Sequence, residues 1–111
     1  VFTFPSTGKW LIDFHVVFNN DSGYGRTYGT IEVSRAGDAS DFSGLGQQLG
    51  NKHASSNSYV YVSPIMLDIT NTSTQTIKFK TNFFGTNTTS LAGASGNEWW
   101  TGASFTKIAS T

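Results

Sequence analysis

One alternating stretch constrains the fold of this chain more than any other feature. From Lys9 to Asn19, nearly every second residue is large and apolar. Successive side chains of a β-strand point to opposite faces, so the members of such a set all lie on one face. These residues are Trp10, Ile12, Phe14, Val16 and Phe18. A strand with one wholly apolar face predicts a wide sheet whose inner side is buried against a second layer.

The rest of the chain predicts further strands and no helix. No segment repeats apolar residues at helical spacing without interruption by glycine or β-branched residues. Clusters of Gly, Asn, Asp and Ser separate the segments that favour strands. The expected strands cover residues 1–4, 9–19, 27–35, 59–69, 75–84 and 99–110, and the segment 36–58 is expected to be a loop with one short strand near 47–49. This spacing is typical of an all-β antiparallel sandwich, in which Pro64 predicts an edge or a bulge.

The composition limits the kinds of partner. The 111 residues suit a single domain, 1–111, and seven basic residues balance seven acidic ones. Nucleic acid is not an expected partner, because its binding needs a basic face. No apolar run approaches the ~18 residues of a membrane-spanning helix, so membrane insertion is not expected. The chain has no cysteine and opens in mid-pattern at Val1, so we expect the C-terminal module of a longer protein, with at least one strand before Val1.

Several positions near the start of the chain, and one segment near its end, match a family signature. The early positions are Phe2, Gly8, Trp10, Ile12 and Phe14. Their order resembles the second half of the signature of the complement component 1q globular domain, a relative of tumour necrosis factor. Here Trp10 replaces the family's usual tyrosine and Ile12 its usual phenylalanine. The segment 104–108, Ser-Phe-Thr-Lys-Ile, is similar to the family's closing strand.

This resemblance implies a jelly roll that assembles as a homotrimer. In a jelly roll the last strand lies beside the early ones. In relatives of tumour necrosis factor, the outer face of one sheet lies along the threefold axis. On the strand 9–19 that face carries Leu11, Asp13, His15 and Val17. These four residues are therefore the expected trimer interface, with a solvated sheet face as the alternative.

Four aromatic residues are candidates for contact with a ligand. Tyr24 is flanked by glycines, and Phe42 lies in a polar, glycine-rich segment. Trp99 and Trp100 are adjacent, so one of them must face away from the core if that segment is extended. Exposed aromatic rings stack on sugars and anchor protein contacts. The alternative for all four is ordinary core packing.

Catalysis and metal binding are not the expected roles of this chain. Asp13 and His15 share a face of one strand, but no nucleophile motif accompanies them, so a surface or interface pair is expected instead of a triad. Asp38 and Asp41 offer carboxylate oxygens that suit calcium, yet aspartate in such a loop is ordinarily a turn residue. No cofactor is therefore expected. A glycan hydrolase, the enzymatic alternative, needs two opposed carboxylates, and the acidic residues here are scattered.

The expected function is a non-enzymatic, trimeric binding or structural head of a bacteriophage virion appendage or tail fibre. A cysteine-free, nearly neutral β-domain rich in Ser, Thr, Asn and Gly is typical of such modules, and the resemblance implies receptor binding. The expected partners are further copies of the chain and a host-surface glycan or protein, and the expected location is the virion surface. One alternative is a capsid decoration protein that binds other virion proteins. Another is a secreted recognition domain similar to complement or a cytokine.

Overall fold

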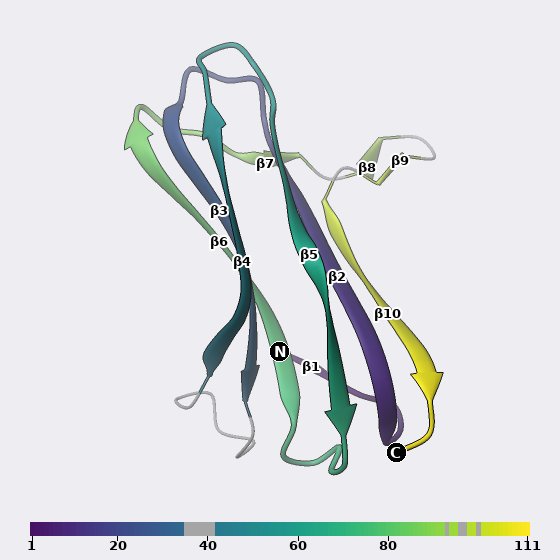
Figure 1. Cartoon of the computed structure of the whole chain (residues 1–111). Helices are drawn as coiled ribbons and strands as arrows, with labels where there is room; N and C mark the ends of the chain where they lie inside the picture. Colours follow the sequence, from purple (N-terminus) through teal and green to yellow (C-terminus); the bar gives the residue numbers. More distant parts are fainter. Residues whose placement is uncertain (35–41, 93, 96–97, 100) are drawn as a thin grey trace.

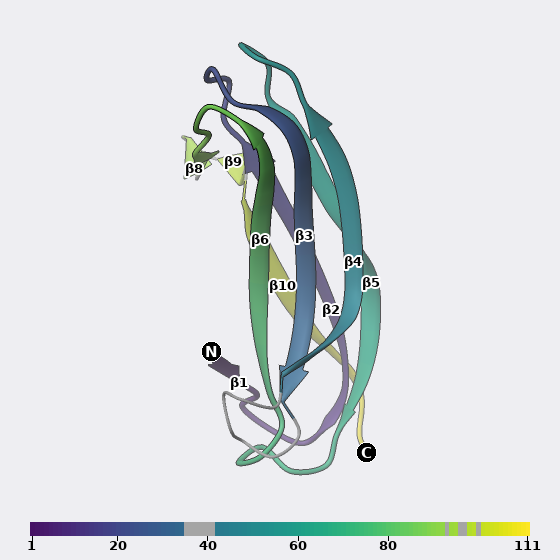
Figure 2. The same ribbon diagram turned by 90° about the vertical axis from the view of Figure 1, so that its left-hand side faces the viewer.

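The chain folds into two antiparallel β-sheets stacked face to face (Figures 1 and 2). The computed structural model describes residues 1–34, 42–92, 94–95, 98–99 and 101–111, and no helix occurs in these residues. The strands are β1 (Phe2–Thr3), β2 (Gly8–Phe18), β3 (Tyr24–Ser34), β4 (Ser43–Lys52), β5 (Ser58–Ile69), β6 (Thr76–Thr86), β7 (Leu91–Ala92), β8 (Ala94–Ser95), β9 (Glu98–Trp99) and β10 (Gly102–Ala109). The predicted all-β antiparallel sandwich is confirmed.

The two sheets differ in strand order. Sheet A runs β1–β6–β3–β4, and sheet B runs β10–β2–β5 with β7 beside β2. The strands β8 and β9 form a separate pair. The molecule measures 45 × 33 × 18 Å, and its shortest dimension suits two sheets packed roughly 10 Å apart.

The alternating face of β2 is the centre of the core, as predicted. All five of its large apolar residues are buried. They pack against inward-facing residues of both sheets, namely Ile31 and Ile77 from sheet A and Val60, Val62 and Ile69 from β5. Aromatic rings close the lower part of the core, where the rings of Phe14 and Phe79 lie 4.8 Å apart and those of Phe79 and Phe105 lie 5.8 Å apart. Burial of this face is what holds the two sheets together.

The predicted irregularity at Pro64 is confirmed as a bulge. The register of β2 against β5 shifts between Ile12, which pairs with Ile65, and Phe14, which pairs with Val62. Two residues of β5 therefore oppose the single residue Asp13. Proline has no backbone N–H to donate, so it is accommodated where the ladder is interrupted.

The prediction that 36–58 is mainly loop was wrong in its extent. The strand β4 covers ten residues, Ser43–Lys52, although glycine and glutamine are poor strand formers. Its glycines have a steric purpose. A Cβ at Gly46 would lie 3.3 Å from both Ile65 and Val62, and one at Gly50 would lie 3.1 Å from Val60. The backbone of β4 thus approaches β5 of the other sheet too closely for larger side chains.

Two strand boundaries also differ from the prediction. The strand β3 begins at Tyr24 rather than at residue 27, and β10 begins at Gly102 rather than at 99. Trp99 belongs instead to β9, where it pairs with Ala94.

The path of the chain gathers three connections at one end of the sandwich. The connections from β2 to β3, from β4 to β5 and from β6 to β7 all lie at the upper end in Figure 1. All three cross from one sheet to the other. This end is where side chains from both sheets and three loops meet.

Candidate functional site

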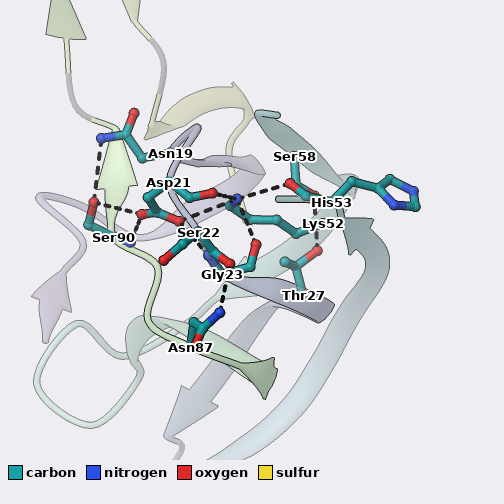
Figure 3. Close-up of polar contacts among 10 residues, drawn as sticks. All are labelled: Asn19, Asp21, Ser22, Gly23, Thr27, Lys52, His53, Ser58, Asn87 and Ser90. Carbon is teal, nitrogen blue, oxygen red and sulfur yellow. Dashed lines mark hydrogen bonds and ion pairs between the residues drawn. The ribbon is translucent and has the colours of Figure 1, made fainter. Parts of the chain in front are cut away.

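A polar cluster around Lys52 joins the three connections at the upper end (Figure 3). Lys52 is the last residue of β4, and its side chain has no exposed area. Lysine is seldom fully buried, because removing an ammonium group from water is costly unless the charge is paired and hydrogen-bonded. The surroundings of Lys52 must therefore supply acceptors.

The Lys52 Nζ atom has four oxygen partners. It donates to the backbone carbonyl oxygens of Gly23 at 2.8 Å, Asp21 at 3.1 Å and His53 at 3.2 Å. It also lies 3.3 Å from Oδ1 of the Asp21 carboxylate. An ammonium group has three donors, and this arrangement uses all of them. The β2–β3 loop is thereby fixed to the end of β4.

The Asp21 carboxylate extends the cluster to the segment before β7. Its Oδ2 accepts the backbone N–H of Ser90 at 2.9 Å, and its Oδ1 accepts that of Gly23 at 3.2 Å. Partial desolvation raises the pKa of Asp21. Hydrogen bonds from Thr89, from the Ser90 and Gly23 backbones and from Lys52 outweigh that effect and lower the pKa to about 2. The Asp21 carboxylate beside Lys52 is therefore charged at all physiological pH values.

This cluster positions the start of β3. Directly after it, Gly25 has φ of +149°, and a Cβ at that position would collide with the backbone of Phe84 and Gly85. Only glycine allows β3 and β6 to approach so closely with this backbone conformation. Tyr24 lies next to this close approach of β3 and β6, and about half of its side chain is exposed. The cluster thus has a structural role that the sequence analysis missed.

The four aromatic ligand candidates are not brought together. Tyr24 pairs with Thr86 at the upper end of sheet A. Phe42 precedes β4 at the opposite end, where it is half-buried and its ring lies 4.3 Å from the Lys78 Nζ atom. Trp100 lies outside the described residues, and of Trp99 only the pairing within β9 is described. A single surface that includes both Tyr24 and Phe42 is not formed.

The four interface candidates lie on the outer face of sheet B, but one of them, Val17, is not accessible there. Leu11 is exposed, and Asp13 and His15 are half-buried. Val17 is buried within its own chain, where it pairs with Ala92 of β7 and its N–H donates to Thr101 Oγ1 at 3.0 Å. Val17 therefore offers little surface to another copy of the chain.

The strand β5 supplies the larger part of this face. Met66 pairs with Leu11, Tyr61 with His15 and Tyr59 with Val17. Tyr59 is 72% exposed, Met66 60% and Tyr61 54%. The sequence held a signal for them, since Tyr59 and Tyr61 alternate with the buried Val60 and Val62. We call Leu11, Tyr59, Tyr61 and Met66 the sheet B stripe.

The acidic and basic residues of sheet B do not assemble a catalytic triad. Ser104 is the register partner of Asp13, so a serine, an aspartate and a histidine do share the outer face. The Asp13 carboxylate, however, accepts a hydrogen bond from Tyr61 Oη at 3.4 Å, and no bond joins it to His15 or Ser104 in the described part of the chain. A triad depends on that chain of hydrogen bonds.

Metal binding has no support from the described residues. They contain no group of three His, Asp or Glu side chains placed to hold an ion. The calcium candidates Asp38 and Asp41 lie outside the described residues. Among the same described residues, no long apolar helix suited to crossing a membrane is found.

Comparison with family models, curated proteins and solved structures found no match to this chain. Function must therefore be argued from the geometry of the molecule.

Proposed function

We propose that this chain is a non-enzymatic recognition head that works as a homotrimer on a virion appendage such as a phage fibre. The observation that carries the proposal is the sheet B stripe. Large contiguous apolar patches on a monomer mark sites of association. Tyrosine and methionine are enriched at protein interfaces. Threefold symmetry is what the resemblance to the complement and tumour necrosis factor families implies.

The strand order supports a jelly roll. The last strand, β10, pairs with the early strand β2, as the resemblance predicts. Consecutive strands also alternate between the sheets, from β2 to β3 and from β4 through β5 to β6. Such crossing connections are typical of the Greek-key arrangement from which jelly rolls are built.

The geometry of the stripe favours a copy of the same chain as its occupant. Leu11 and Met66 are register partners, and Tyr61 and Tyr59 follow along β5 beyond Asp13 and the bulge at Pro64. Two of the polar groups beside it, the Asp13 carboxylate and Tyr61 Oη, bond to each other at 3.4 Å. Burying the stripe against another copy of the chain removes apolar area from water while the bond between Asp13 and Tyr61 is kept.

The positions of the acidic side chains disfavour a glycan hydrolase. Such an enzyme needs two carboxylates that face each other across a cleft. Asp21 is held by Lys52 at the upper end, Glu32 pairs with Lys78 at 3.3 Å on sheet A, and Asp13 lies on sheet B. No two of these three carboxylates face a common cleft.

Light scattering at micromolar concentration tests whether the protein is a trimer. Attachment assays with the parent particle test whether the domain recognises the host surface. The folded protein is expected to have three times the mass of one 12.0 kDa chain. A stable folded monomer contradicts the proposal. For recognition, a parent particle that lacks the domain is expected to lose attachment to host cells. Normal attachment with reduced particle stability would favour the capsid decoration alternative.

A further inference from the structure

We propose that the outer face of sheet A binds sugars that carry a carboxylate group, such as uronic or sialic acids within a glycan. This inference rests on the proposed function of recognition and names its class of ligand. The residues concerned come from β3, β4 and β6 near the upper end of the sandwich. They are Arg26, Tyr28, Leu49, Asn51, Asn82 and Phe84, which we call the sheet A platform.

The register of sheet A places these residues in two neighbouring rows. Arg26 pairs with Phe84 on one side and with Asn51 on the other. Tyr28 pairs in the same way with Asn82 and Leu49. Directly opposed residues share a face of the sheet. Because the intervening residues Thr27, Gly29 and Ile31 are buried, the two rows face outward.

Two aromatic rings form the apolar part of the platform. The rings of Tyr28 and Phe84 meet edge to face, with centroids 5.4 Å apart and an angle of 88° between planes. The ring of Phe84 is 61% exposed, whereas its neighbour Phe83 points to the other face of β6 and packs against the core. An exposed ring held by an edge contact presents a rigid flat surface, on which the apolar C–H face of a sugar ring can stack.

A shallow hollow lies beside these rings. It is lined by Arg26, Leu49, Gly50 and Asn51 and has a volume of about 260 Å³. That volume suits a sugar unit rather than a helix or a folded loop. Gly50 contributes only backbone to the hollow, because a side chain at this position would point inward, toward Thr27 and Val60.

The polar groups around the hollow are free to bind. Arg26, Asn51 and Asn82 make no side-chain hydrogen bond or ion pair within the described part of the chain. Asparagine offers both a donor and an acceptor to sugar hydroxyls, and the planar guanidinium matches a carboxylate with two parallel bonds. Arg26 is thus the group that would choose an acidic sugar over a neutral one.

The charge of the face supports an anionic ligand. The outward positions of sheet A carry three cations, Arg26, Lys78 and Lys80, and one carboxylate, Glu32, among the described residues. Lys78 and Glu32 neutralise each other at 3.3 Å. The charge that remains is positive and lies toward the hollow. A sugar is favoured over an acidic peptide because the face is flat, shallow and lined by amides and rings.

Titration of the isotope-labelled protein, followed by amide NMR shifts, tests this assignment. The probes are glucuronic acid and N-acetylneuraminic acid, with glucose as the neutral counterpart and a Glu-rich peptide as the acidic one. We expect saturating shifts for the acidic sugars that map to residues 24–30, 47–52 and 82–86. Glucose and the peptide are expected to bind at least tenfold more weakly.

Variants assign the contacts. Phe84→Ala is expected to weaken binding of the acidic sugars at least tenfold, and Arg26→Gln to abolish their advantage over glucose. Ile108→Ala, which shortens an exposed apolar side chain on β10 of the opposite sheet and outside the sheet B stripe, is the control and should leave binding unchanged. Melting curves verify that each variant is folded.

Three outcomes overturn the proposal: no saturable shift with either acidic sugar, equal binding of glucose, or shifts that map away from the sheet A platform. Binding of the peptide alone would assign the face to a protein partner and would overturn it as well. If the protein is a trimer but binds no sugar, the sugar-binding proposal fails and the trimeric recognition head remains supported. If the protein is a monomer that binds acidic sugars, the trimer proposal fails and the sugar-binding proposal remains supported.

Discussion

The two outer faces of the sandwich use apolar residues in different ways. On sheet B, Leu11 pairs with Met66, and Tyr61 lies farther along β5, beyond Asp13, with which its hydroxyl group bonds. On sheet A, the rings of Tyr28 and Phe84 alternate with amides and with Arg26, whose guanidinium has no partner among the described residues. A stripe of large apolar side chains suits a partner that stays bound, whereas rings mixed with free hydrogen-bonding groups suit a ligand that exchanges with water. The same strand alternation therefore yields two surfaces with different chemistry.

The Lys52 cluster fixes the loops at the upper end of both sheets. Disrupting it should therefore weaken the functions of both outer faces together. Lys52→Met keeps most of the length of the side chain but removes the donor that serves three carbonyl oxygens and the charge that faces the Asp21 carboxylate. Loss of a buried, paired charge is expected to cost about 3 kcal/mol of the free energy of unfolding. Denaturant titration of the variant measures this cost. Self-association and sugar binding should weaken together, because the loops at the upper end support strands of both sheets.

A surface substitution is the control for that experiment. Lys80→Met also replaces a lysine by methionine, but at an exposed position on β6. It is expected to change the free energy of unfolding by less than roughly 0.5 kcal/mol. Equal stability of the Lys52→Met variant and the wild type would show that the buried ion pair contributes nothing.

Equivalent substitutions on the two faces test the comparison directly. Met66→Lys places a charge in the sheet B stripe, and Leu49→Lys places one on sheet A. Both side chains are more than half exposed in the single chain, so neither variant should unfold it. Met66→Lys is expected to weaken self-association at least a hundredfold, because a charge would be buried without a partner. Leu49→Lys should leave the oligomer unchanged.

Sedimentation or light scattering over a dilution series measures both variants. Dissociation caused by Leu49→Lys, with Met66→Lys still assembled, would reverse the assignment of the two faces. Dissociation in both would mean that the chain associates through both sheets.

The sequence could predict the fold wherever local pattern and packing agree. The alternation from Trp10 to Phe18 specified both the strand and its buried face, and Pro64 specified the bulge. The strand β4 was missed because its glycines have low strand propensity. Gly46 and Gly50 are required there by the closeness of β5, a contact between distant segments that local pattern does not reveal.

The candidate site was harder to predict for the same reason. Lys52 looks like any lysine at the end of a strand, and its burial depends on carbonyl oxygens of Asp21 and Gly23, about thirty residues earlier. Tyr24 and Phe42 are both aromatic residues in polar surroundings, but the sequence does not show that they lie at opposite ends of one sheet. By contrast, Tyr59 and Tyr61 could have been assigned outward from their alternation with Val60 and Val62.

The inward and outward positions of β4 also differ in the space available to a side chain. Gly50 and Gly44 illustrate the two cases. A Cβ at Gly50 would lie 2.8 Å from Thr27 Oγ1 and 3.1 Å from Val60, whereas at Gly44 the nearest atom is 3.7 Å away. Gly50→Ala is expected to cost about 2 kcal/mol through overpacking. Gly44→Ala should be neutral or should stabilise by roughly 0.4–1 kcal/mol, because alanine restricts the unfolded chain. Thermal unfolding of the two variants compares them, and equal effects would contradict the close approach of β4 to β5.

The smallest expected effect is the contribution of Asp21 to stability in acid. Its pKa is about 2 in the folded protein against an ordinary value of 3.8. A carboxylate whose pKa is lowered by folding stabilises the folded state above the unfolded pKa, and this stabilisation is lost as the pH falls through the folded pKa. The contribution of Asp21 should therefore be constant from pH 7 to about 4 and should disappear between about 4 and 2.

Comparison of the wild type with Asp21→Asn isolates this contribution, since the other carboxylates titrate equally in both proteins. Asparagine keeps one acceptor oxygen, which can serve either the Ser90 or the Gly23 N–H group, and it carries no charge for Lys52. The difference in melting temperature between the two proteins should be level above pH 4 and should close as the pH approaches 2. A difference that stays constant down to pH 2 would mean that the charge of Asp21 is not what stabilises the cluster. In that case the hydrogen bonds of Lys52 to backbone carbonyl oxygens would be sufficient to hold the upper end of both sheets.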